Sequence, residues 1–108
     1  TREDQPIIRS QIFRVSFSTE LELAKFTLVE SIKDVRGVRN SPSPVVIATE
    51  TTDSWVALKL VYYIDDYGQQ YAIADRVIAA ALEALKDQNI PTASSRLTIE
   101  AVNLMPRL

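Results

Sequence analysis

Apolar and polar residues alternate near the start of the chain, which is the pattern of a half-buried β-strand. Over residues 12–17, Phe13, Val15 and Phe17 fall on one side, and the residues between them are polar. A period of two is the period of side chains along a strand. The pattern therefore predicts a first strand here, with residues 1–9 as a polar lead-in.

Two further apolar stretches lie close together in the middle of the chain. Residues 45–49 form a β-branched run, and residues 55–64 alternate again, separated from them by a short polar turn. Strands joined this tightly form an antiparallel hairpin. In the longer strand, five residues share one face: Val56, Leu58, Leu60, Tyr62 and Ile64.

Helical spacing of apolar residues appears in two stretches. The first follows Thr19 and Glu22, which have the spacing of a capping box, and Gly37 is placed to end it. We therefore expect a helix over residues 20–36. Its apolar stripe consists of Leu21, Ala24, Leu28, Ile32 and Val35.

Residues 69–88 are rich in alanine and predict a second helix. Asn89 tolerates the left-handed conformation that ends a helix, and Pro91 prevents continuation. The broad apolar face of this helix consists of Ala74, Val77, Ile78, Ala81, Leu82 and Leu85.

Residues 96–102 alternate once more and predict a fourth strand. The order β-α-β-β-α-β is that of a ferredoxin-like α+β fold, a four-stranded antiparallel sheet with both helices on one face. We expect this domain over residues 10–103, a linker at 1–9 and a tail at 104–108. The core should come from Phe13, Val15, Leu28, Ile32, Ile47, Leu58, Leu60, Val77, Ala81, Leu85 and Ile99.

Composition narrows the chemistry that the chain can perform. The 108 residues include neither cysteine nor histidine, which removes thiol nucleophiles, zinc–thiolate sites and the commonest general base. We expect no enzyme, no cofactor and no metal. The net charge of −2 disfavours nucleic acid as a partner, and no apolar run approaches the ~20 residues of a membrane helix.

Three other chemical readings are weaker than they first look. Glu50 and Asp53 lie at the opposite end of the third strand from Asp65 and Asp66, so the four carboxylates cannot share a site and are better explained as turn and cap residues. Aromatic residues on the open sheet face resemble an RNA-binding platform, but the glycine-containing aromatic signature is missing. An acylphosphatase needs a glycine-containing loop after the first strand to bind phosphate, and the segment at 18–20 in this chain has no glycine.

Leu23 and Phe26 lie away from the apolar stripe of the first helix, so the domain alone should expose them. Trp55 and Tyr63 fall on the sheet face that the helices leave open. Isolated exposed apolar residues are normal on soluble proteins. We nevertheless interpret Leu23, Phe26, Trp55 and Tyr63 as subunit contacts.

Four segments together resemble the C-terminal cytoplasmic domain of the small-conductance mechanosensitive (MscS) channel family. They are FRVSFSTE at 13–20, PSPV at 42–45, SWVALKL at 54–60 and NIP at 89–91. Their order and spacing carry the resemblance, which covers residues 12–102. Asn89 and the residues after Pro91 depart from the family pattern.

The resemblance implies a channel domain on the cytoplasmic side of the membrane. Identical subunits would form the wall of a vestibule there, joined to the membrane-embedded part of the same chain through residues 1–9. This fragment itself would not touch the membrane. The alternative is a free-standing ferredoxin-like module that binds a small molecule or a regulatory partner, because this fold hosts many functions.

Overall fold

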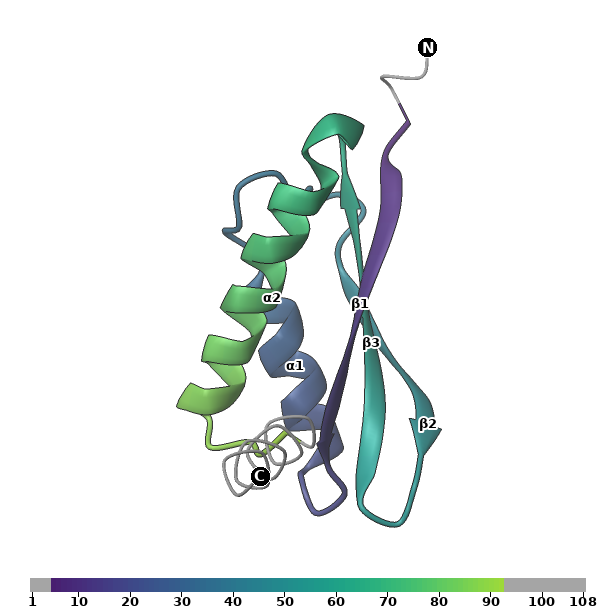
Figure 1. The fold of residues 1–108 in the computed structure, drawn as a ribbon, viewed down its shortest axis with the longest axis vertical. Helices are drawn as coiled ribbons and strands as arrows, with labels where there is room; N and C mark the ends of the chain where they lie inside the picture. Colours follow the sequence, from purple (N-terminus) through teal and green to yellow (C-terminus); the bar gives the residue numbers. More distant parts are fainter. Residues whose placement is uncertain (1–4, 93–108) are drawn as a thin grey trace, which may run out of the picture.

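An antiparallel sheet with two helices against one face makes up residues 5–92, the part of the chain that this computed structural model describes (Figure 1). The three strands lie in the order β1-β3-β2. The α+β class is therefore confirmed. The elements in chain order are β1 (Ile7–Ser16), α1 (Leu21–Ser31), β2 (Val45–Thr51), β3 (Trp55–Ile64), a short 3-10 helix η2 (Tyr67–Gln69) and α2 (Gln70–Asp87).

The central strand, β3, has the bounds that its alternation predicts. It pairs antiparallel with both neighbours, so the predicted hairpin with β2 is confirmed. A bulge interrupts the β2 register between Ala48 and Glu50. Every residue of β3 but Lys59 is apolar, so this strand presents apolar side chains to both faces of the sheet.

The core lies between the sheet and the helices. Leu58, Leu60, Tyr62 and Ile64 of β3 are fully buried, as are Leu28, Ile32, Val77, Ala81 and Leu85 from the helical side. Gln11 Nε2 donates a hydrogen bond of 3.2 Å to the buried Tyr62 hydroxyl. The predicted core is confirmed at Phe13, Val15, Leu28, Ile32, Leu58, Leu60, Val77, Ala81 and Leu85.

Ile47 is the one described residue for which the core prediction is wrong. Its neighbour Val46 pairs with Leu60 and so faces the helices, which turns Ile47 to the other face of the sheet, opposite Lys59. A run of three β-branched residues has no alternation from which to choose the buried face. Ile99 lies outside the described residues.

The first strand is displaced relative to its prediction. It begins at Ile7, within the stretch expected to be a lead-in, and it ends at Ser16. Phe17 therefore lies in the following turn and is exposed, although its backbone N–H still donates to the Ser54 carbonyl at 2.9 Å.

The first helix is shorter than predicted and is capped differently. Its N-cap is Glu20, whose carboxylate accepts a hydrogen bond of 3.0 Å from the Leu23 amide. The predicted capping box of Thr19 and Glu22 is therefore wrong. The helix ends at Ser31, and the chain then makes irregular turns up to Gly37, which has a φ of +102°.

The second helix and its termination are confirmed. Asn89 has a φ of +59°, and the Ile90 amide donates to the Leu85 carbonyl at 2.9 Å, which is the six-residue closure of a Schellman motif. Ile90 is buried beneath this turn. On the predicted apolar face, Ile78 and Leu82 are exposed, because that face is wider than the area covering the sheet.

After α2 the chain arrives at the free edge of β1. Thr92 forms an isolated antiparallel bridge with Val15, and the Ser16 amide donates to the Pro91 carbonyl at 3.1 Å. The predicted strand at residues 96–102 and the predicted tail at 104–108 lie outside the described residues.

Candidate functional site

The sheet face opposite the helices carries an exposed group of apolar side chains, which we call the sheet patch. It comprises Ile8 and Ile12 of β1 and Val45 and Ile47 of β2, with exposed fractions between 48% and 63%. Each of the strands β1 and β2 contributes two of these residues, so the patch is formed by two segments that are distant in the sequence. Contiguous apolar surface of this kind commonly marks an interaction site.

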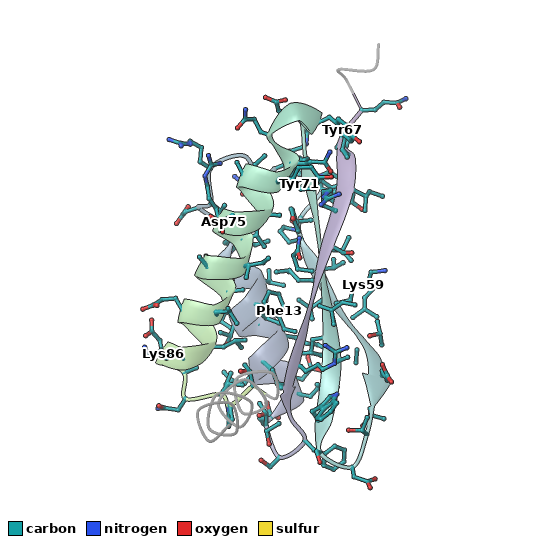
Figure 2. All side chains as sticks on the ribbon, viewed as in Figure 1. Phe13, Lys59, Tyr67, Tyr71, Asp75 and Lys86 are labelled. Atoms are coloured by element: carbon teal, nitrogen blue, oxygen red, sulfur yellow. The ribbon has the colours of Figure 1, made fainter. Side chains whose placement is uncertain are left out.

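Cross-strand register makes the sheet patch continuous. Val61 of β3 lies opposite Val45, and Tyr63 lies opposite Ile8. Lys59 lies between Ile12 on one side and the β2 residue Ile47 on the other. Figure 2 shows Lys59 pointing away from the helices, whereas Phe13 points into the layer between sheet and helices.

A second apolar group, which we call the helix patch, lies on the other side of the domain. Leu23 and Phe26 of α1 are 41% and 63% exposed and line a hollow of about 280 Å³ together with residues from the end of α2. Glu30 and Asp87 also line this hollow. The helix patch is thus apolar with acidic neighbours, while the sheet patch is apolar with a lysine at its centre.

The four predicted contact residues do not form one site. Leu23 and Phe26 come together as expected from their spacing. Trp55 and Tyr63 share the open face but lie at opposite ends of β3, about 26 Å apart for eight residues of strand. Both are only partly exposed. Their role as subunit contacts stays a prediction.

Sequence reasoning missed the residues that dominate the open face. Ile8 lay in the expected lead-in, and Ile47 was placed in the core. Ile12 and Val45 were within predicted strands, but no role was given to them. The alternation itself held the signal, because an apolar residue at Ile12 is out of phase with Phe13 and Val15.

The acidic pair that follows β3 has a structural role. Asp66 accepts a hydrogen bond of 3.0 Å from the Gly68 amide at the start of η2, and Asp65 forms an ion pair of 2.6 Å with Arg39. Within residues 5–92, no three carboxylate, histidine or cysteine side chains are grouped so that they could hold a metal ion. In the same range, no helix is both long and apolar enough to span a membrane.

The sequence matches a known protein family over most of its length. Residues 8–92 match the family described as "Mechanosensitive ion channel MscS, C-terminal". The chain belongs to this family. The resemblance inferred from the four segments is therefore confirmed, and the family match begins at residue 8, so it also includes the first half of β1, which those segments did not cover. The family is one of channel domains rather than of enzymes.

Solved structures of similar fold come from a plant channel. The cryo-EM structure of Arabidopsis thaliana MSL1 A320V has a TM-score of 0.70 and 11% identity, covering 82% of this chain and 35% of that one. The cryo-EM structure of Arabidopsis thaliana MSL1 has a TM-score of 0.70 and 12% identity, and the match covers 82% of this chain and 34% of the MSL1 chain. No curated protein matches the sequence.

This chain spans about a third of the length of those MSL1 chains. At 10–12% identity, the likeness concerns the fold alone.

Proposed function

We propose that this chain is the cytoplasmic C-terminal part of a mechanosensitive channel subunit, where it joins identical subunits into the wall of a vestibule below the pore. The proposal is supported by membership of the MscS C-terminal family and by two apolar patches on opposite sides of the domain. The position of the two patches is the observation that carries it.

Opposite patches suit a ring better than a two-fold dimer. In a two-fold dimer, one patch meets its own copy, and the other patch stays exposed. In a ring, each subunit presents one surface to the neighbour before it and a different surface to the neighbour after it. We infer that the helix patch of one subunit packs on the sheet patch of the next.

Charge favours the same pairing. Lys59 lies at the centre of the sheet patch, and the hollow of the helix patch contains Glu30 and Asp87. Glu30 forms an ion pair of 2.9 Å with Lys33, but the two side chains are 40% and 55% exposed and can exchange partners. Complementary charges of this kind set the register of an interface more than its affinity.

The proposed role has no catalytic step. Its consequences are assembly and the filtering of solutes that approach the pore, while tension would be sensed by membrane-embedded parts of the same subunit. Those parts would join this domain through the residues that precede β1. Apolar runs of about 20 residues encoded upstream of Thr1 in the parent gene would support this arrangement.

We also propose that residues 96–102 pair with the free edge of β1 and complete a four-stranded ferredoxin-like sheet. The support is the bridge between Thr92 and Val15, which starts an antiparallel ladder along that edge. The Ser16 amide points to this edge, and so do the amides of Ser10 and Ile8, which continuation of the Val15–Thr92 register would place opposite residues 97 and 99. Protection of both amides from hydrogen exchange, lost on truncation after Thr92, is the expected result.

Assembly is tested by sedimentation of the chain at increasing concentration. We expect wild-type protein to self-associate and Phe26→Ser to do so at least about tenfold more weakly, because a large apolar contact is lost. Ala79→Ser, an exposed substitution on α2 outside both patches, is the control. Unchanged association of Phe26→Ser would rule out the helix patch as an interface.

A further inference from the structure

A second hollow, separate from both apolar patches, lies at the end of the sheet where β3 runs into α2. Its volume is about 450 Å³. Figure 1 shows the connection between α1 and β2 passing beside the first half of α2, and this connection forms one wall. The lining residues that matter here are Arg36, Gly37, Arg39, Asp65, Asp66, Gln69 and Arg76.

The wall formed by the connection is held in place from two sides. A Cβ atom on Gly37 would lie 2.6 Å from Ile73 Cγ1, so the backbone there is packed directly on α2. The Arg39 amide donates to the Tyr63 carbonyl at 2.8 Å, and Val38 bridges Ile64. The hollow is therefore bounded by fixed backbone and not by a loose loop.

Three arginine side chains line this hollow, and two of them are oriented by hydrogen bonds. Arg76 Nη1 donates to the Arg36 carbonyl at 2.9 Å. Arg39 donates from Nε to the Ser41 carbonyl at 2.8 Å and from Nη1 to Asp65 at 2.6 Å. Each guanidinium has five N–H donors, so both retain several that are unused.

Arg36 is different from the other two. No hydrogen bond or ion pair within residues 5–92 engages its guanidinium. The backbone of Arg36 is nevertheless fixed, because its carbonyl accepts a hydrogen bond from Arg76 and the next residue, Gly37, is packed on α2. The hollow thus combines two preorganised guanidinium groups with one that is free to close on a ligand.

The two carboxylates at the hollow are already engaged. Asp65 is paired with Arg39, and Asp66 accepts from the Gly68 amide. Three arginines against two aspartates leave one net positive charge in a chain whose net charge is −2. The local charge therefore favours an anion, and the side-chain amide of Gln69 adds a neutral donor.

We propose that this hollow binds a phosphate-type oxyanion, either free phosphate or the phosphate group of a larger molecule. Guanidinium groups match the oxygens of phosphate geometrically and form strong charge-assisted hydrogen bonds with them. Groups from three segments of the chain surround one volume, which suits a tetrahedral anion better than a planar carboxylate. The volume is also within the usual range of small-molecule sites.

The chain has only two glycines, which gives a direct spectroscopic test. Protein labelled with ¹⁵N-glycine and ¹⁵N-tryptophan shows two glycine amide signals and one indole N–H signal, and Gly37 lines the hollow. The indole N–H of Trp55, at the far end of β3 and roughly 30 Å away, serves as the remote reference. Inorganic phosphate, pyrophosphate and ATP are titrated separately, each against sodium chloride of the same ionic strength.

We expect a saturable shift of the Gly37 signal with phosphate-type ions and none at Trp55. Tighter binding of inorganic phosphate than of ATP would identify free phosphate as the ligand, and the reverse order would identify a phosphorylated molecule. An equal shift with sodium chloride, or no saturable shift with any of the three, would overturn the proposal.

Two variants locate the binding to the arginines. Arg36→Gln removes the unengaged guanidinium and should weaken binding at least about tenfold, as for a lost hydrogen bond to a charged group. Arg14→Gln, an exposed substitution on the sheet face away from the helices, should bind phosphate-type ions as the wild type does. Equal affinity of Arg36→Gln and wild type, with unchanged melting temperature, would also overturn the proposal.

Discussion

The two faces of the sheet are built from the same kinds of residue but have different surroundings. On the face towards the helices, Leu58, Leu60, Tyr62 and Ile64 are completely buried by α1 and α2. On the other face, Ile8, Ile12, Val45 and Ile47 are no less apolar but are about half exposed or more. The chain supplies a cover for the first face within residues 5–92, and we infer that a neighbouring subunit covers the second.

The largest expected effect separates the two faces by stability. Leu60→Ala should lower the free energy of unfolding by about 2–5 kcal/mol, because it leaves a cavity in a fully buried site. Ile12→Ala, on the open face, should cost no more than about 1 kcal/mol, the range of strand propensity. Urea unfolding at low protein concentration measures both. Similar losses for the two variants would show that the open face is also part of the monomer core.

A smaller effect is expected where the connection after α1 is packed on α2. Gly37→Ala introduces a Cβ 2.6 Å from Ile73 at a φ of +102°, so it should destabilise the domain by about 1–3 kcal/mol. Gly68→Ala is the matched control, since its Cβ would meet only the Asp66 carboxylate at 3.3 Å. Thermal unfolding compares the two. A Gly37→Ala variant as stable as Gly68→Ala would contradict this packing.

The smallest effect concerns the start of α1, the helix that carries the helix patch. Glu20→Ala removes the carboxylate that accepts from the Leu23 amide and should cost about 0.5–1 kcal/mol. Thr19→Ala should change stability very little, although the sequence predicts Thr19 as the cap. Urea unfolding of both variants decides between the two capping schemes. A larger loss with Thr19→Ala would favour the predicted capping box.

Local patterns predicted the elements whose sequence has one dominant period. The alternation of β3 and the helical face of α2 were enough to place both, and Gly37 and Asn89 mark positions with positive φ as their chemistry requires. These features depend on residues close together in the sequence. Such features can therefore be predicted from one sequence without knowledge of the tertiary contacts.

Features that depend on long-range packing were placed less well. The β-branched run in β2 could present either Val46 or Ile47 to the helices, and only pairing with β3 decides which. The start of β1 at Ile7 likewise depends on its pairing with Ile64. The cluster of Arg36, Arg39 and Arg76 joins segments 40 residues apart, so no local pattern indicates it.

The assembly account is tested most directly by mixing two variants that cannot assemble alone. Ile12→Thr with Ile47→Thr disables the sheet patch and leaves the helix patch intact, whereas Phe26→Ser does the reverse. If the helix patch of one subunit packs on the sheet patch of the next, each variant should sediment as a monomer. An equal mixture should then form a heterodimer that grows no further. Self-association of Phe26→Ser alone as strong as that of the wild type, or a mixture that stays monomeric while the wild type assembles, would contradict the account.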